Sequence, residues 1–131
     1  MVKFVQCVTR KQGMEAIEFR NRWNEYGAQL ETMMHDRPNV LRFRLSTTLL
    51  VKETVGFMID YGSSAPYDGM VELWLDDATI TSANLKDPKN KAILGALVGS
   101  LNDFIDRDKS TAFFASEDMG FDREPSLKRS A

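Results

Sequence analysis

The strongest candidate for catalysis is a single acid inside a hydrophobic strand pattern. Glu72 lies in the run GMVELWL, residues 69–75, and shares its strand face with Trp74. Burial disfavours the ionised form of a carboxyl group, whereas a nearby arginine favours it. Glu72 could therefore be a general acid or base that faces a cavity. It could also form a structural ion pair with Arg42 or Arg44 on a neighbouring strand.

Tyrosine hydroxyls could assist such chemistry, because a phenol can donate a hydrogen bond to a ligand carbonyl or phenolate. Tyr67, and Tyr61 with it, precede the acid-bearing strand and could lie over the mouth of a pocket. Tyr26 is expected on a helix and offers a third hydroxyl. Asp68 stands between Tyr67 and a glycine, which favours a turn role for its carboxylate. Arg44 could bind an acidic ligand group, or it could pair with acids across the sheet or a dimer interface.

A stripe of large side chains with one gap raises the question of a cavity. Large side chains recur at steps of three and four along one helical face, at Phe19, Trp23, Tyr26, Leu30 and Met33. Gly27 interrupts this helix, where a glycine costs about 1 kcal/mol relative to alanine. Either the helix packs closely against a neighbour here, or the glycine leaves a space that no side chain fills. A flat organic ligand would suit that space, held between Trp23, Trp74 and Phe104.

Several chemistries have too few residues to support them. The chain has one histidine and one cysteine, His35 and Cys7, which are far apart in the sequence. We therefore expect no metal site, no nucleophilic triad and, without a phosphate-binding glycine loop, no cofactor. His35 ends a predicted helix, where a cation suits the helix dipole; a catalytic base is the alternative. The net charge of −2 gives no reason to expect nucleic acid or an anionic membrane as partner.

Strand and helix signals alternate along the chain. The main predicted elements follow in the order strand 2–9, helix 14–35, strand 40–51, strand 69–75, helix 89–106 and strand 110–117. A shorter helical stretch is expected before Pro88, which splits the second helical region. This β-α-β-β-α-β order predicts an α+β, ferredoxin-like fold, in which an antiparallel sheet carries its helices on one face.

The segment KETVGFMIDYGSSAPYD, residues 52–68, is predicted as a loop. With that length and that many apolar side chains, it is typical of a lid, a binding loop or an oligomer contact. The domain is expected to span residues 1–118, and residues 119–131 to form a flexible tail. The first residues do not resemble a signal peptide, and no apolar run approaches the ~20 residues that span a bilayer. We therefore expect a cytoplasmic protein without a membrane partner.

Three stretches of the sequence resemble one family. FRNRWNEYGAQLE, residues 19–31, resembles the first-helix segment of the EthD-like proteins, and PYDGMVELWLDD, residues 66–77, resembles their Tyr-Asp-Gly-x-x-Glu-x-Trp-Phe strand. Residues 87–118 resemble their last helix and strand. The resemblance implies a homodimer in which two ferredoxin-like sheets form a dimeric α+β barrel with the helices outside. The family and its wider superfamily include proteins tied to ether degradation, polyketide cyclases and dehydratases, cofactor-free monooxygenases and lactone isomerases.

The chain departs from the family pattern in the first helix. Where the pattern carries histidine this sequence has Gly27, and where it carries proline this sequence has Gln29. An acid–base role of that histidine therefore cannot be transferred to this chain. Gly27 could instead mark an enlarged pocket, in which Tyr26 or the ligand fills the space.

Two functions follow as expectations. The first is a cofactor-free enzyme that acts on a hydrophobic cyclic molecule, polyketide-like or aromatic, by cyclisation, dehydration, isomerisation or cofactor-independent oxygenation. Glu72 would be its acid or base, and Tyr26 and Tyr67 would orient an oxygen atom. The expected substrate-binding residues are Trp23, Gly27, Tyr61, Trp74, Phe104 and Arg44. The second function is a non-catalytic dimer that binds or carries a hydrophobic metabolite.

Overall fold

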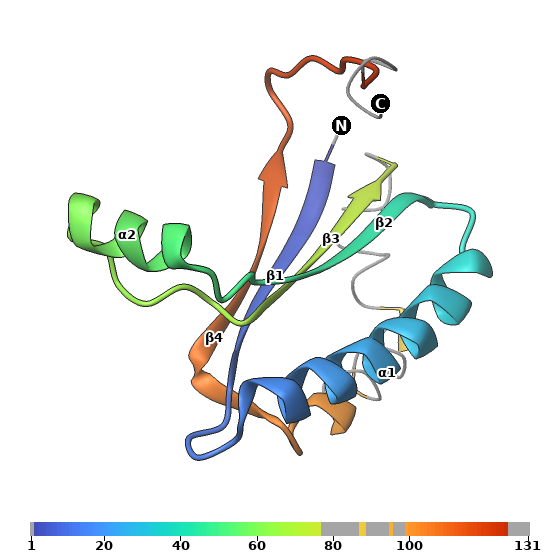
Figure 1. Ribbon diagram of the computed structural model, residues 1–131. Helices are drawn as coiled ribbons and strands as arrows, with labels where there is room; N and C mark the ends of the chain where they lie inside the picture. The colour runs from blue at the N-terminus through green and yellow to red at the C-terminus, as the bar shows by residue number, and fades with distance from the viewer. Residues whose placement is uncertain (1, 77–86, 89–94, 96–98, 126–131) are drawn as a thin grey trace.

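A computed structural model of the chain describes residues 2–76, 87–88, 95 and 99–125 (Figure 1). Within these residues the elements are β1 (Val2–Arg10), α1 (Ala16–His35), β2 (Val40–Thr47), α2 (Lys52–Tyr61), β3 (Gly69–Leu75) and β4 (Ile105–Ser116). The strands form one antiparallel sheet in the order β2-β3-β1-β4. This order and direction confirm the ferredoxin-like α+β fold.

The strand register divides the side chains between two faces of the sheet, because residues paired across antiparallel strands point to the same side. Gln6 pairs with Val71, which pairs with Leu45; these residues lie on the face covered by α1, here called the helix face. Val5 pairs with Glu72, which in turn pairs with Arg44, so these three residues lie on the opposite face. No helix of the described residues covers that opposite face, here called the open face.

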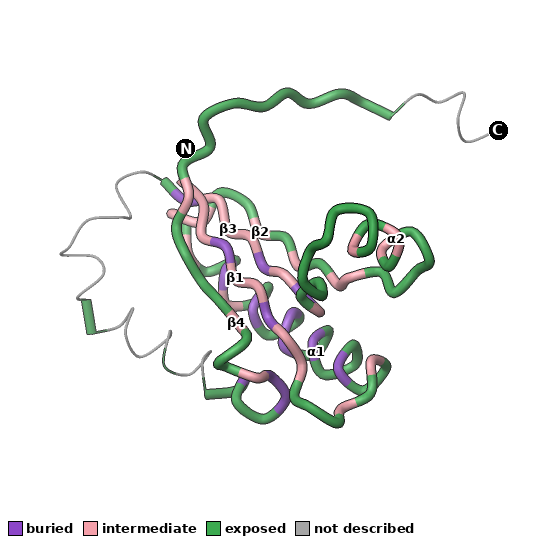
Figure 2. The backbone as a smooth tube through the Cα atoms, turned by 90° about the vertical axis from the view of Figure 1, so that its left-hand side faces the viewer, coloured by how far each residue is buried: buried purple, intermediate pink, exposed green. Residues whose placement is uncertain are grey.

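The core lies between α1 and the helix face, as the aromatic stripe predicted. The buried side chains of α1 recur at helical spacing, and only the last position differs from the prediction, since Met34 is buried and Met33 is half-buried. Figure 2 shows this buried strip on the side of α1 turned to the sheet. The other members of the core cluster come from the strands and from the segment that precedes β4: Val8, Val71, Leu101, Phe104 and Ile105.

The segment predicted as a loop contains a helix, so that prediction is wrong for its first part. Lys52–Tyr61 form α2, and Gly62 ends it in the left-handed conformation with φ 62°. The Thr54 hydroxyl donates to the Leu49 carbonyl oxygen at 2.8 Å, which satisfies one acceptor just before the helix. β2 accordingly ends at Thr47, earlier than predicted.

The end of the second helical region also differs from the prediction. Most of the predicted helix 89–106, and the stretch before Pro88, lie outside the described residues. Residues 99–101 are helical, and β4 already begins at Ile105. Residues 117–125 have no regular secondary structure, and the boundary at residue 118 stays a prediction. Among the described residues, no helix has the length and apolar character needed to cross a membrane.

Candidate functional site: a groove between α1 and β2

Glu72 forms an ion pair on the open face. Its Oε2 accepts a hydrogen bond from Lys3 Nζ at 2.8 Å, and the two side chains are 18% and 27% exposed. Lys3 is the diagonal neighbour of Glu72 across β1 and β3. The expected ion pair is therefore present, but with Lys3 in place of Arg42 or Arg44. Burial, and secondarily the charge of Glu72, raise the pKa of the neighbouring Cys7 thiol.

Trp74 lies beside this ion pair between two cations. Lys3 Nζ and the Arg42 guanidinium carbon each stand 5.2 Å from the indole ring centroid. The indole N–H donates to a carboxylate oxygen of Glu117. The Arg44 guanidinium donates to the carbonyl oxygen of Phe43 at 2.8 Å. The open face therefore carries a mixed cationic and aromatic surface around Trp74.

The other aromatic residues predicted to hold a ligand belong to the core. Trp23 stacks on Tyr26 with ring centroids 5.3 Å apart, and Phe104 meets Tyr26 edge-on at 6.3 Å. The Tyr26 hydroxyl donates to Gln6 Oε1 at 3.4 Å, and burial raises the Tyr26 pKa. These three rings fill the space between α1 and the sheet. The sheet separates them from Glu72, so the structure does not bring the predicted catalytic residues into one site.

The two remaining tyrosines are exposed and lie apart from Glu72. Tyr61 is on α2, where its ring stacks on Phe57 with centroids 4.6 Å apart. Tyr67 precedes β3, and its carbonyl oxygen accepts a hydrogen bond from the Thr48 hydroxyl. Asp68 ends the loop before β3, and its Oδ2 accepts a hydrogen bond from the backbone N–H of Arg10 in β1 at 2.8 Å, a contact between distant segments rather than a turn.

Gly27 makes room for a side chain of the sheet. A Cβ atom built at Gly27 would lie 2.9 Å from Leu45 Cδ1, closer than real Cβ contacts. Leu45 thus enters the gap in the aromatic stripe, which corresponds to the close-packing alternative. The glycine also borders a groove, because α1 has no side chain there to cover the edge of Leu45.

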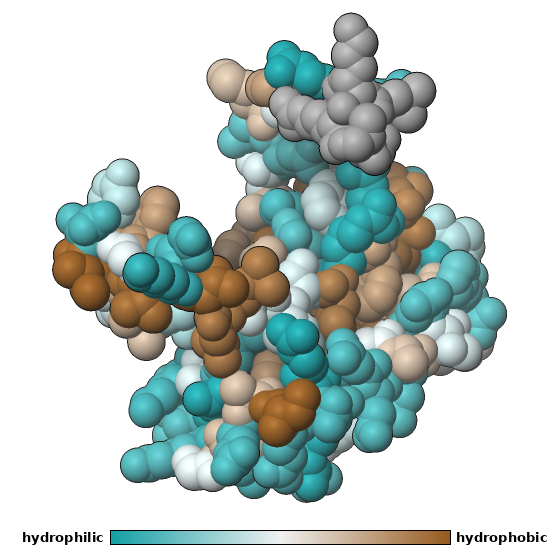
Figure 3. Space-filling view, in the orientation of Figure 1, coloured by the Kyte–Doolittle hydropathy of each residue, from teal (hydrophilic) through white to brown (hydrophobic). Residues whose placement is uncertain are grey.

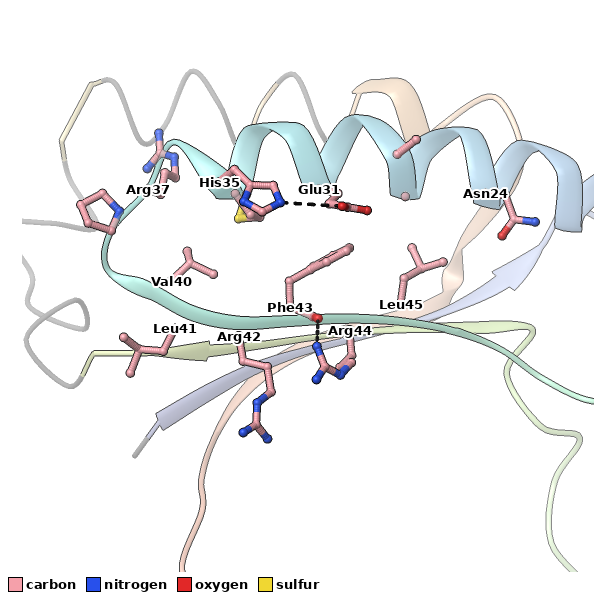
Figure 4. Close-up of a pocket in the computed structure, with 14 residues that line it drawn as sticks. Asn24, Glu31, His35, Arg37, Val40, Leu41, Arg42, Phe43, Arg44 and Leu45 are labelled. Atoms are coloured by element: carbon pink, nitrogen blue, oxygen red, sulfur yellow. Dashed lines mark hydrogen bonds and ion pairs between the residues drawn. The ribbon is translucent and has the colours of Figure 1, made fainter. Parts of the chain in front are cut away.

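The groove runs between α1 and the edge strand β2 and has a volume of about 850 Å³. Figure 4 shows Val40, Phe43 and Leu45 pointing from β2 toward α1, so that they form an apolar floor. In the same view the side chains of Arg42 and Arg44 extend to the other side of the strand. Of the predicted binding residues, Gly27 and Arg44 are among the lining residues, but the Arg44 side chain points away from the groove.

The α1 wall of the groove carries polar groups, of which the sequence pattern had singled out His35 alone, as a helix-end cation or a catalytic base. Asn24, Glu31 and His35 all line it, and His35 Nε2 lies 3.7 Å from Glu31 Oε1. Both side chains of this pair are exposed. Their spacing of seven and four residues was the signal that could have found them, since it repeats the helical period of the buried stripe beside it. No group of three or more metal-ligating side chains occurs among the described residues.

A family profile described as EthD domain matches residues 11–107, which include the aromatic stripe, the groove and β3. The chain belongs to the EthD family. No curated protein matches this chain significantly.

Solved structures show the same fold at low identity. An EthD family protein from Bacillus halodurans C-125 is 16% identical with a TM-score of 0.56, covering 89% of this chain and 98% of that one. A dimeric ferredoxin-like protein of unknown function from Thermobifida fusca is 10% identical with a TM-score of 0.56, covering 88% and 89%. A putative antibiotic biosynthesis monooxygenase from Deinococcus radiodurans is 10% identical with a TM-score of 0.55, covering 95% and 100%.

In this EthD domain, two of the stretches that resemble the family meet in space. A Cβ atom built at Gly69 would lie 2.6 Å from Cε2 of the Trp23 indole ring. The ring is held in place, because its Nε1–H donates to the Ser46 carbonyl oxygen at 3.0 Å. The Trp of the first-helix stretch and the Gly of the Tyr-Asp-Gly strand therefore form one packing contact, which explains their residue types without a catalytic role.

Proposed function

We propose that this EthD domain binds a hydrophobic, cyclic small molecule in the groove between α1 and β2. The observation that carries the proposal is the groove itself, with an apolar floor from β2 and polar groups along one wall. Its volume of about 850 Å³ lies within the ~300–1,000 Å³ of typical small-molecule sites. A ring could lie on Phe43 and Leu45, and Asn24 could hydrogen-bond its polar substituent.

A homodimer is part of this proposal. Three structures similar to this chain are described as dimeric proteins with a ferredoxin-like fold, and the open face leaves Trp74 half-buried and Phe113 exposed within one chain. Packing two open faces together would bury these side chains and the Lys3–Glu72 ion pair. A cytoplasmic location remains a prediction.

Catalysis on the same ligand is the second candidate function, and one observation favours it. The His35–Glu31 pair stands on the groove wall, where a histidine could move a proton next to a ligand carbonyl. Glu72 lies across the sheet from this groove and would not be the base. The reaction would be a cyclisation, dehydration, isomerisation or cofactor-free oxygenation. The likeness to a putative antibiotic biosynthesis monooxygenase agrees with this chemical class, although at 10% identity it shows the fold alone.

Binding can be tested with 1-anilinonaphthalene-8-sulfonate, a fluorescent aromatic probe, and with native mass spectrometry of protein from its own host. Ala28→Trp places a large ring in the groove from an exposed position, and Gln29→Trp, at the next exposed position outside the groove lining, is the matched control. We expect Ala28→Trp to weaken probe binding at least about tenfold and Gln29→Trp to leave it unchanged. Equal binding by both variants would contradict the proposed groove.

Catalysis is tested with whichever molecule the native protein retains. His35→Gln should lower the turnover of that molecule by about 10²-fold or more while binding persists, and Glu72→Gln should not. Loss of turnover in Glu72→Gln alone would move the chemistry to the open face. If the wild type and every variant retain the molecule but none turns it over, the result would favour the non-catalytic carrier function.

A further inference from the structure

α2 carries a wide apolar surface that the described part of its own chain leaves exposed. At about 100° per residue, its apolar side chains occupy about 200° of the helix circumference, roughly twice the stripe of an ordinary surface helix. The apolar set consists of Val55, Phe57, Met58, Ile59 and Tyr61. None of the residues of α2 is buried, and Phe57, Ile59 and Tyr61 are at least 65% exposed. Within the described part of the chain, this wide apolar side of α2 stays largely uncovered.

α2 projects away from the rest of the chain on the side of the sheet opposite to α1 (Figure 1). Figure 2 shows it beyond the β2 edge of the sheet, and Figure 3 shows hydrophobic surface gathered on the projecting helix. Exposed apolar side chains continue into the segment before it, at Leu49, Leu50 and Val51. The apolar surface of α2 is thus on the same side of the molecule as the open face.

The helix is too short to persist without packing. Isolated helices of fewer than ~12–15 residues are marginal in water, and α2 has 10 residues. Its C-terminal turn at Gly62 and the Thr54–Leu49 hydrogen bond define its ends but bury none of its apolar side chains. The free energy that orders α2 must therefore come mainly from a surface outside the described part of its own chain.

We propose that α2 packs against a second copy of this chain and extends the dimer interface beyond the open face. The proposal rests on the homodimer proposed above. A second sheet packed on the open face would come to lie beside α2, so the two apolar surfaces would form one continuous interface. In a two-fold dimer each chain would both supply α2 and receive the partner's α2, so the α2 contact would occur twice in the interface.

The charges of α2 disfavour a membrane as the alternative occupant. Helices that lie on anionic bilayers carry lysine and arginine on their polar side. The ionisable side chains of α2 are Lys52, Glu53, Asp60 and Tyr61, so the helix carries one positive and two negative charges at neutral pH. An anionic surface would not attract such a helix. Its mixed charges are compatible with a protein interface.

The test uses the full chain with Phe57→Ser and Ile59→Ser, separately and together. Serine has a helix propensity similar to those of phenylalanine and isoleucine, so α2 loses apolar surface without losing intrinsic helicity. Asp60→Ser is the matched control on the same helix. Dimer dissociation constants come from sedimentation equilibrium, and hydrogen exchange of α2 amides is followed above and below the dissociation constant.

We expect each Ser variant to raise the dimer dissociation constant about 100-fold, because a tenfold loss occurs at each of two equivalent contacts. Asp60→Ser should not change it, and α2 amides should be protected only in the dimer. An unchanged dissociation constant with unprotected α2 in an intact dimer would overturn this inference and leave the proposed homodimer standing.

A wild-type chain that stays monomeric at every concentration would overturn both the proposed homodimer and the proposed contact of α2. Binding of the wild type, but not of the double variant, to phosphatidylcholine/phosphatidylserine vesicles, with an unchanged dimer, would assign the helix to a membrane instead.

Discussion

Two glycines of this chain lie against side chains of the core, but they differ in what they lie against. Gly69 faces the rigid indole ring of Trp23, which is fully buried and fixed by its hydrogen bond to Ser46. Gly27 faces the terminal methyl groups of Leu45, which can rotate away. The packing therefore excludes a side chain at position 69 more strictly than at position 27.

Alanine substitutions should separate these two positions. We expect Gly69→Ala to lower the free energy of unfolding by about 2 kcal/mol, because overpacking a core typically costs ~1–3 kcal/mol. Gly27→Ala should cost much less, since alanine regains about 1 kcal/mol of helix propensity while Leu45 shifts. Urea denaturation of both variants measures the difference. A larger loss in Gly27→Ala than in Gly69→Ala would contradict this account of the packing.

The buried Tyr26 phenol and the half-buried Cys7 thiol predict a loss of stability at alkaline pH. Burial raises the pKa of both Tyr26 and Cys7 in the folded chain, so the folded state holds these protons more tightly than the unfolded state. Their contribution is complete below the unfolded pKa values, about 8.5 for cysteine and about 10 for tyrosine, and is lost as the pH rises above them.

The free energy of unfolding should therefore fall from about pH 8.5 upward and more steeply above about pH 10. Tyr26→Phe should remove the steeper part and Cys7→Ser the earlier part, with Tyr61→Phe at an exposed position as the control. Denaturation at a series of pH values measures these slopes, and an identical slope in Tyr26→Phe and wild type would refute the assignment.

At the scale of elements, Asp68 fixes the start of β3 against the end of β1. Its carboxylate accepts from the Arg10 backbone N–H, and its own N–H donates to the Val8 carbonyl oxygen at 2.8 Å. Its carbonyl oxygen accepts from Thr48 N–H at 3.0 Å, which adds the end of β2. One residue thus holds three strands where the chain enters β3.

Asp68→Ala should lower the free energy of unfolding by about 2 kcal/mol, because it leaves the partly buried Arg10 N–H without its charged acceptor. Asp122→Ala, in the exposed segment after β4, is the control and should change the free energy by less than about 0.5 kcal/mol. Thermal and urea unfolding measure both. Equal stability of the two variants would show that the contact contributes little.

At the scale of the whole molecule, the two faces of the sheet have different roles. The helix face builds the core of one chain, and the open face is where we propose that two chains meet. Val5 is buried on the open face within a single chain, whereas Phe113, its partner in the register, is 47% exposed. The exposed Phe113 ring is therefore the residue best suited to test the proposed contact.

Phe113→Ser should raise the dimer dissociation constant at least about tenfold, because a large apolar side chain would lose its burial. Ile17→Ser is the matched control, since Ile17 is an exposed apolar residue on α1, away from the open face. Size-exclusion chromatography with light scattering over a range of concentrations compares them. A dimer that responds to Ile17→Ser and not to Phe113→Ser would place the interface elsewhere.

The sequence alone determined the fold class and much of the core, because these depend on local periodicity. The spacing of Trp23 and Tyr26 predicted the buried side of α1, and the alternation in GMVELWL placed Glu72 opposite Val71 and predicted β3 at its observed bounds. The apolar character of residues 52–68 was also evident, although the helix Lys52–Tyr61 within them was missed.

Only the tertiary structure decided which residues meet. It paired Glu72 with Lys3 and filled the gap at Gly27 with Leu45. It also separated Tyr26 from Glu72 by the thickness of the sheet. The physical reason is that strand register and the packing of α1 on the sheet set these distances, and both join residues that lie far apart along the chain.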